Sequence, residues 1–412
     1  MHEYSFAEIR HMHEYSFAEI RHFHDIFSLY QWDRSGERTR YAFRRMPEFF
    51  PHAIIHRDGP VAELAAAPRE DIPSMVVRTP LGMLAIDDYI QQGPVDGVVI
   101  LQQGKIIYER YPRMHPRDNH LLMSVSKVFA SAVIAILEDR GLVDTTLGVE
   151  TYIPEVRGSG WEGVSVRDVL DMASGIDCDE MAPDAYSDPA AKYYRFEASL
   201  GLLPPAVDDG VSTYDYTATL GRARTPGEAY DYNSVNTFVL SWIAECVTGK
   251  GYSEILTDEI WSKIGAEGDA LISSSRSGAT APHGGMVTRL RDLARFGLLY
   301  TPSWNVVSAE PLVSERHLAA IQHDGRPQLL ANGNRYPKGQ LERLAPAVPL
   351  FNSYQWDFVM PDGSFFKGGM GGQGLYIAPN ADIVVAFNGI LGPDGKESAL
   401  MSIAQQVIER LS

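Results

Sequence analysis

Strand-like segments lie near both ends of this sequence, and the long stretch between them has the pattern of helices. Residues 96–101 and 105–111 are rich in β-branched and aromatic residues, and a turn containing Gly104 joins them. This pattern predicts an antiparallel hairpin. Strand-like runs return only after residue 350, at 354–360, 374–378 and 383–387. We therefore expect one sheet built from both ends of the chain.

The clearest predicted helix covers residues 124–140, where apolar residues recur with helical spacing before Gly141 supplies a stop. Further helices are expected at 83–90, 166–172, 236–247, 289–300 and 397–411. The order of elements favours an α/β (α+β) fold, with an antiparallel sheet flanked by helices and a large, mostly helical insertion. The expected parts are an N-terminal arm at 1–80, a sheet subdomain from 81–145 and 350–412, and a mostly helical subdomain at 146–349.

The N-terminal arm begins with a tandem duplication. Residues 1–11 (MHEYSFAEIRH) recur unchanged as residues 12–22. A repeat architecture needs at least about three copies, so we interpret the 1–22 segment as a duplicated start and assign it no function.

Composition excludes several classes of partner. The formal net charge is -17, so the average surface field repels nucleic acid and anionic membranes. The two cysteines, Cys178 and Cys246, are too few for a disulfide framework and are expected to be reduced. No apolar run reaches the roughly 18 residues of a membrane span, and the first 30 residues lack a signal-peptide pattern. We expect a cytoplasmic protein.

Ser124 and Lys127 form an S-x-x-K motif at the start of the predicted helix 124–140. A three-residue offset places both side chains on one helix face, where the amine can reach the hydroxyl. We expect Ser124 to act as nucleophile, and we hypothesise that apolar surroundings let Lys127 act as its base. Ser364 and Lys367 match the same motif, but they follow a turn and lead into glycines rather than a helix.

Two downstream segments carry further candidates. Tyr232 lies just before the predicted helix 236–247, where it could relay a proton to a leaving group, although it could equally be an ordinary interface tyrosine. Residues 369–374 match G-x-G-x-x-G, but strand-like residues ending in Pro379 follow them where a dinucleotide loop opens a helix. These glycines suit an oxyanion hole and a rail for substrate instead.

Motifs of other hydrolases are missing from the sequence. It contains no G-x-S-x-G nucleophile elbow, no H-E-x-x-H or paired C-x-x-C zinc motif, and no Walker A loop. We expect neither a metal nor a cofactor.

The three motifs, taken in order, resemble those of serine β-lactamases, DD-peptidases and family VIII carboxylesterases. Within this superfamily the sequence is similar to the 6-aminohexanoate-dimer hydrolases, which are nylon-oligomer amidases, over roughly residues 95–410. The phrases that carry the likeness are Met123–Lys127, Tyr232–Thr237, Gly284–Gly285 with Arg291–Arg295, and Gly372–Gln373.

The resemblance implies roles for individual residues. It makes Ser124 the nucleophile, Lys127 the base and Tyr232 the proton relay. The N–H of Met370 would join that of Ser124 in the oxyanion hole, and Tyr186 would contact the scissile amide.

Other positions that the resemblance suggests lie around the substrate. Glu197 could pair with an ammonium group of the substrate; the alternative is that it is a solvated surface glutamate. His283 stands where the 6-aminohexanoate-dimer hydrolase that this sequence resembles has Asn. The remaining residues assigned to substrate binding are Ser234, Lys367 and Gly369. Two motifs differ from those of many β-lactamases. The tyrosine motif at Tyr232 reads Tyr-Asn-Ser where those enzymes have Tyr-x-Asn, and the motif at Lys367 reads Lys-Gly-Gly where they have Lys-Thr-Gly. Both departures weaken the case for β-lactam recognition.

We therefore expect a cofactor-free serine hydrolase that cleaves a small linear amide or ester through an acyl-enzyme on Ser124. Its partner would be a small-molecule substrate, and a homodimer is a further expectation. One alternative is a family VIII type carboxylesterase or β-lactamase-like enzyme without useful amidase activity. The other is a non-catalytic sensor module that kept the penicillin-binding fold.

Overall fold

The computed structural model describes residues 15–29, 33–205, 210–333 and 348–411. The first copy of the N-terminal duplication, residues 1–11, lies outside the described residues. Part of the second copy forms the start of α2 (Phe17–Asp25), which Ser16 caps through a hydrogen bond from the Glu19 N–H.

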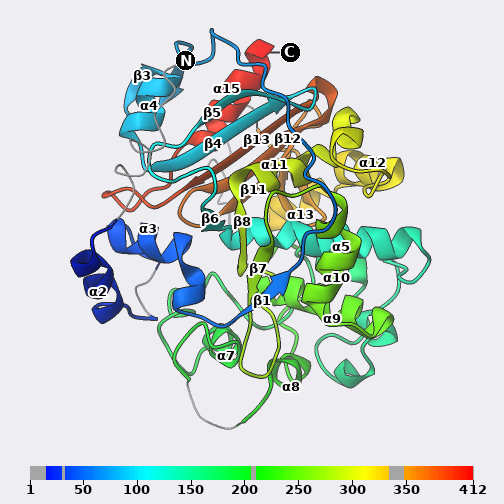
Figure 1. The fold of residues 1–412 in the computed structure, drawn as a ribbon. Coiled ribbons are helices and arrows are strands. Elements are labelled where there is room, and N and C mark those ends of the chain that lie inside the picture. Colours follow the sequence, from blue (N-terminus) through cyan, green and yellow to red (C-terminus); the bar gives the residue numbers. More distant parts are fainter. Residues whose placement is uncertain (1–14, 30–32, 206–209, 334–347, 412) are drawn as a thin grey trace.

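A seven-stranded antiparallel sheet, made from both ends of the chain, forms the centre of the fold. The strand order is β5-β4-β13-β12-β11-β10-β9. The strands are β4 (Val95–Gln102), β5 (Lys105–Arg110), β9 (Phe351–Ser353), β10 (Trp356–Val359), β11 (Phe365–Gly369), β12 (Gln373–Ala378) and β13 (Ile383–Gly389). In Figure 1 the cyan strands β4 and β5 lie beside the orange strands of the C-terminal part. The predicted hairpin and the sheet built from both chain ends are confirmed.

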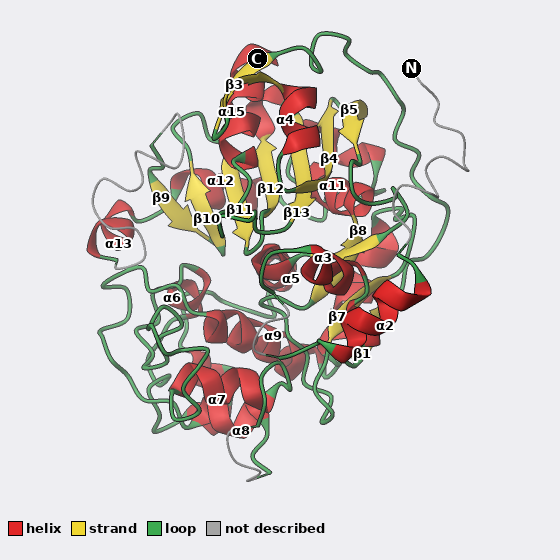
Figure 2. Ribbon diagram, turned by 90° about the vertical axis from the view of Figure 1, so that its left-hand side faces the viewer, coloured by secondary structure: helices red, strands yellow, loops and turns green. Residues whose placement is uncertain are grey.

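Helices cover both faces of this sheet. Successive strand residues point to opposite faces, so Phe366 and Tyr376 pack on the side of α15 (Leu400–Leu411) and α4 (Ile86–Gln92). Phe365 and Leu375 belong instead to the core formed with α11 (Leu290–Leu298), α5 (Lys127–Asp139) and α9 (Ser234–Thr248). Figure 2 shows α5 and α9 beneath the sheet. The site described below lies on this second side.

A second, four-stranded sheet with the order β1-β7-β8-β6 was not predicted. Its strands are β1 (His52–Ile55), β6 (Asn119–Leu121), β7 (Ala270–Ser273) and β8 (Met286–Arg289). The N-terminal arm supplies β1, and α3 (Glu37–Arg44) packs against β6. The boundaries expected for the arm and the two subdomains remain predictions. This sheet matters for function because β6 ends just before Ser124.

Several predicted elements begin later than expected, among them the final helix, which was predicted from residue 397 and begins at Leu400. Residues 83–85 belong to β3 (Gly82–Ala85), which pairs with β2 (Val76–Thr79), so the predicted helix begins only at Ile86. The strand predicted from residue 354 begins at Trp356. Tyr354 and Gln355 have φ values of 48° and 69°, and this left-handed backbone makes the turn between β9 and β10 instead.

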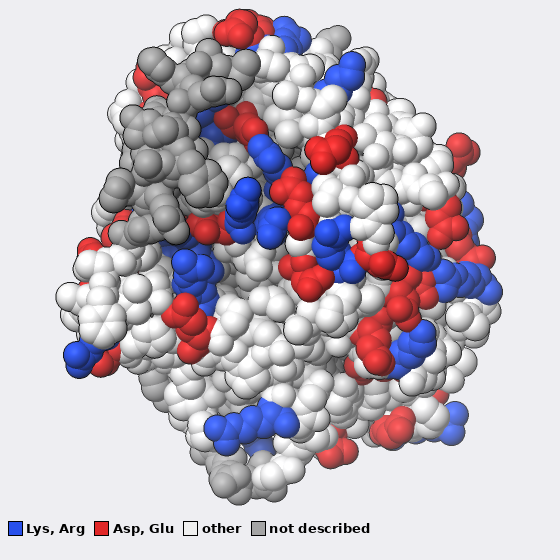
Figure 3. All heavy atoms as spheres, viewed as in Figure 1, with Lys and Arg blue, Asp and Glu red and all other residues white. Residues whose placement is uncertain are grey.

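Shorter helices fill the rest of the chain. They are α6 (Val166–Leu170), α7 (Lys192–Ser199), α8 (Thr213–Ala218), α10 (Tyr252–Glu259), α12 (Glu315–His323) and α13 (Pro327–Asn332). In the described part of the chain, no helix combines the length and the apolar character that crossing a membrane requires. On the face in Figure 3, basic and acidic side chains are interspersed rather than gathered in one basic patch.

Candidate active site

Ser124 lies in a short 3-10 turn, η2 (Met123–Ser126), that leads directly into α5. Met123 has a φ of 49°, a strained backbone of the kind that gathers at functional sites. The start of β8 anchors the turn: the Leu122 N–H donates to the Met286 carbonyl at 2.8 Å, and the Met286 N–H donates to Ser126 Oγ at 3.1 Å. At the start of the turn, the N–H of Ser124 has no partner within the turn itself.

Lys127 is the first residue of α5 and its side chain is fully buried. Its Nζ donates to Ser124 Oγ at 3.2 Å and to the backbone carbonyl of His283 at 2.8 Å. A buried amine needs such partners, because leaving a buried polar group unpaired is costly. The structure thus brings together the two residues of the predicted S-x-x-K motif.

Tyr232 lies between two lysines. The Lys367 Nζ donates to the Tyr232 hydroxyl at 3.4 Å and lies 4.7 Å from the ring centroid, while the Lys127 Nζ lies 5.0 Å from that centroid. The neighbouring Asn233 caps α9 by accepting from the Val235 N–H at 3.0 Å. This cap holds the backbone next to Tyr232 in place. Tyr232 therefore has a defined position beside Ser124 and Lys127, which lie about a hundred residues earlier in the sequence.

Lys367 and Asp357 form a buried ion pair that sequence reasoning missed. Lys367 lies on β11 and Asp357 on the adjacent strand β10, and Lys367 Nζ is 2.6 Å from Asp357 Oδ1. The Gly368 N–H donates to Asp357 Oδ2 at 3.0 Å. The signal in the sequence was a single acidic residue within the apolar run 356–360.

The turn between β11 and β12 lies against the turn that carries Ser124. A Cβ on Gly369 would lie 2.5 Å from the Leu122 carbonyl oxygen, so this close approach requires glycine. The Met370 carbonyl accepts from Gln373 Nε2 at 3.2 Å, and the Gln373 amide also bonds to Gly389 on β13. Gln373 therefore ties the Met370 turn to the sheet. The G-x-G-x-x-G match is a turn between strands.

Glu197 is buried, so the alternative of a solvated surface glutamate is wrong. Its Oε1 accepts from the Tyr193 hydroxyl at 2.7 Å and lies 3.0 Å from His283 Nε2. Burial alone would raise the pKa of Glu197, but the charge of His283 and the hydrogen bonds from His283 and Tyr193 lower it. Glu197 is thus an ionised carboxylate close to the Lys127 amine.

Glu180 is a second buried carboxylate in this region, and it was not predicted. It accepts from the Ser234 N–H at 2.6 Å, in the first turn of α9, where the helix dipole favours a negative charge. It also accepts from the Tyr186 hydroxyl at 3.1 Å. The residue is half exposed, but its hydroxyl group is buried, and this burial together with Glu180 and Glu197 raises the pKa of Tyr186 well above its usual value, so the phenol stays protonated. The structure thereby gathers Tyr186, Ser234, Glu197 and His283 in one cluster.

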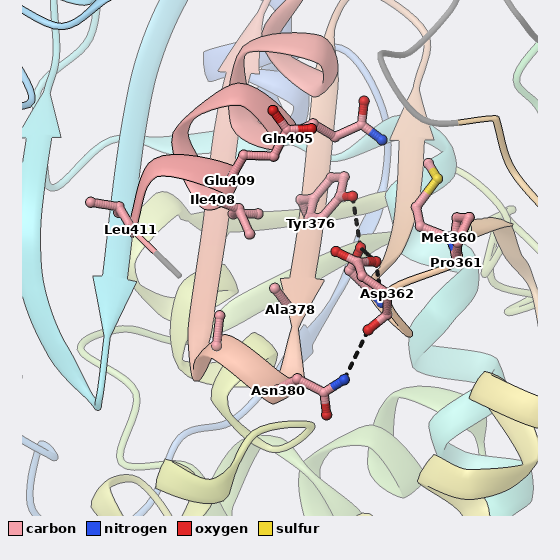
Figure 4. Close-up of a pocket in the computed structure, with 12 residues that line it drawn as sticks. Met360, Pro361, Asp362, Tyr376, Ala378, Asn380, Gln405, Ile408, Glu409 and Leu411 are labelled. Atoms are coloured by element: carbon pink, nitrogen blue, oxygen red, sulfur yellow. Dashed lines mark hydrogen bonds between the residues drawn. The ribbon is translucent and has the colours of Figure 1, made fainter.

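Ser364, the competing serine, points away from Lys367. Its hydroxyl bonds to Asp362 Oδ1 at 2.6 Å and to the Tyr376 hydroxyl at 2.8 Å. Figure 4 shows Asp362 and Tyr376 in a cavity beside the C-terminal helix α15. Because an offset of three residues along extended chain reverses the face, Ser364 and Lys367 cannot act as a pair.

No cluster of three or more His, Cys, Asp or Glu side chains in the part of the chain that the structure describes could hold a metal ion. Both cysteines are free, Cys178 buried and Cys246 exposed.

The family model described as β-lactamase matches residues 85–391. The chain belongs to the β-lactamase family. It is 31% identical over 352 residues to the 6-aminohexanoate-dimer hydrolase of Paenarthrobacter ureafaciens, and the match covers 84% of each chain.

Solved structures share the fold of this chain. A provisionally assigned 6-aminohexanoate-dimer hydrolase from Bacillus anthracis superposes with a TM-score of 0.76 at 22% identity, covering 94% of this chain and 97% of the other. A family VIII carboxylesterase superposes with a TM-score of 0.57 at 16% identity, covering 79% and 95%. This β-lactamase-family protein is a hydrolase with the serine β-lactamase fold.

Proposed function

We propose that this protein is a serine hydrolase that cleaves a small linear amide or ester through an acyl-enzyme on Ser124. The observation that carries the proposal is the position of Lys127 Nζ, 3.2 Å from Ser124 Oγ and 5.0 Å from the centroid of the Tyr232 ring. A nucleophile, a base and a proton donor therefore lie together in one site.

In the acylation step, Lys127 takes the proton from Ser124 and the Oγ attacks the substrate carbonyl. The backbone N–H groups of Ser124 and Met370 stabilise the negative charge on the carbonyl oxygen. The close contact between Gly369 and Leu122 supports this pairing, because it holds the strand end next to the serine turn.

Tyr232 then protonates the leaving amine or alcohol and takes up the proton that Lys127 received from Ser124, so that Lys127 is again a neutral amine. An ammonium can only donate hydrogen bonds, so the Tyr232 oxygen accepts from Lys367 and its own proton is directed elsewhere. Loss of the leaving group completes the acyl-enzyme. Water hydrolyses the ester bond to Ser124 and releases the acid.

The acidic cluster supports a substrate with a cationic end, such as an aminoacyl amide. Glu197 stays ionised although it is buried near Lys127. An ammonium group on the substrate could bind this carboxylate together with His283. Tyr186 is 49% exposed at the edge of this cluster, where it could contact the scissile amide. We propose the 6-aminohexanoate dimer as the first substrate to test.

The test is a fluorophosphonate label followed by peptide mapping. The label should appear on Ser124 and be absent from the Ser124→Ala variant, which should also lose turnover. Labelling of Ser364 instead would refute the assignment.

Two other functions are separated by parallel assays. Rapid turnover of a nitrophenyl ester with no cleavage of the aminohexanoate dimer would identify a carboxylesterase of the family VIII type. A permanent adduct on Ser124 without product release would identify a sensor. The expected homodimer stays a prediction.

A further inference from the structure

We infer that Asp357 is a positioning residue that holds the Lys367 ammonium against the Tyr232 hydroxyl. Its carboxylate also compensates the positive charge of Lys367, so that this charge attracts substrate only weakly. The inference rests on the proposed acyl-transfer function and adds to it a residue and a restriction on substrates. Asp357 acts through Lys367, with which it forms an ion pair.

The sheet register places the two residues opposite each other. Phe358 pairs with Phe366 across β10 and β11, and one further step along the same antiparallel register brings Asp357 beside Lys367. Directly opposed residues of antiparallel strands have adjacent side chains, so the backbone itself specifies this ion pair.

The carboxylate of Asp357 is held from several directions. Its Oδ1 lies 2.6 Å from Lys367 Nζ and 3.5 Å from the Tyr230 hydroxyl, and its Oδ2 accepts from the Gly368 N–H at 3.0 Å. Because the acceptor cannot move, the Lys367 ammonium is held at one point of the site. From there a second N–H reaches the Tyr232 oxygen at 3.4 Å.

This arrangement limits what Lys367 can do. The ammonium is fully buried and its charge is compensated within the protein by Asp357. A compensated, desolvated cation gives little attraction to a carboxylate on the substrate. Lys367 therefore orients Tyr232 and is not a receptor for a substrate anion.

The experiment separates substrates by their leaving groups. Nitrophenolate leaves without being protonated, whereas ethoxide needs a proton, so only the ethyl ester depends on Tyr232. We expect Asp357→Asn to lower kcat/KM for ethyl hexanoate about 10- to 100-fold and for 4-nitrophenyl hexanoate by less than about threefold. In a Lys367→Met background, Asp357→Asn should not change this selectivity further.

A matched control is Asp292→Asn. Asp292 is also a buried aspartate in an ion pair, 3.0 Å from Arg295 on α11, outside the candidate site. Its loss should lower thermal stability and leave the ratio of the two ester rates unchanged. If Asp357→Asn fails to fold, Asp357→Glu keeps the charge but displaces Lys367, and the same selective loss, smaller in size, is expected.

Two outcomes would overturn the inference. One is an equal loss on both esters, which is what simple destabilisation produces. The other is a selective loss that persists when Lys367 is already Met. Ser124→Ala, measured alongside, keeps the two proposals apart: residual turnover in that variant refutes the proposed function, whereas an unselective Asp357 variant refutes only the role of Asp357.

Discussion

The Nζ atom of Lys127 lies 3.2 Å from the Oγ atom of Ser124. The carbonyl of His283 holds the same nitrogen from the other side at 2.8 Å, so the amine cannot swing away from the serine. Two separate stretches of the chain thus hold the amine beside the hydroxyl.

Replacing Lys127 should abolish acylation while the fold persists. Lys127→Met removes the base and should lower kcat/KM by about 100- to 10,000-fold. Lys127→Arg should be equally inactive, because a guanidinium does not give up its proton in proteins. Ester turnover, with circular dichroism as a check on folding, measures both. Arg activity near that of the wild type would contradict a role as base.

Replacing Glu197 should alter substrate preference rather than chemistry. Glu197→Gln keeps the size of the side chain but removes the charge that an ammonium would share. We expect kcat/KM for 4-nitrophenyl 6-aminohexanoate to fall by about tenfold or more relative to 4-nitrophenyl hexanoate. The neutral ester is the internal control, and an equal fall for both would remove Glu197 from substrate recognition.

Gly369→Ala should disturb the oxyanion turn. Its Cβ would meet the Leu122 carbonyl oxygen at 2.5 Å, so the strand end or the serine turn has to shift. We expect a loss of kcat of about tenfold or more, since removing an aligned oxyanion donor costs at least that much. Gly221→Ala is the control, because no atom lies within 4 Å of its Cβ position. Unchanged kcat in Gly369→Ala would argue against the Met370 N–H as a donor.

His317 should make stability depend on pH. It is buried in α12, and burial lowers its pKa to about 4. The unfolded chain takes up a proton below pH 6.5, the ordinary pKa, whereas the folded protein resists it, so stability falls as the pH falls from 6.5 to 4. The expected loss is about 1.4 kcal/mol per pH unit, or about 3 kcal/mol in all.

Denaturant unfolding at several pH values between 4 and 7 measures this slope. His317→Gln should flatten it, whereas His323→Gln, an exposed histidine on the same helix, should not. An unchanged slope in His317→Gln would show that other groups cause the acid sensitivity.

The predictable part of the site was local in the sequence. Ser124 and Lys127 are one helical turn apart, so the offset and the apolar periodicity after them were enough to predict their contact. The sheet from both chain ends was predictable for a similar reason, because period-two patterns and turn residues identify strands one at a time.

What was missed depends on pairing between distant segments. The Asp357–Lys367 pair follows from strand register, which no single segment encodes. The strands β7 and β8 are four residues each, too short for their alternation to stand out within a helix-rich region. Glutamates such as Glu180 and Glu197 usually lie at the protein surface, and only the tertiary packing of this fold buries them.

Because the central sheet contains strands from both ends of the chain, its assembly also determines when activity can appear during synthesis. A growing chain that has not yet reached β11 already contains Ser124 and Lys127, but β4 still lacks its neighbour β13 and the serine turn lacks Gly369 beside it. Ser124 is therefore translated early, but the site around it forms only after the C-terminal strands have been made. A premature stop codon anywhere ahead of β11 would therefore leave a chain without turnover, rather than a weak enzyme.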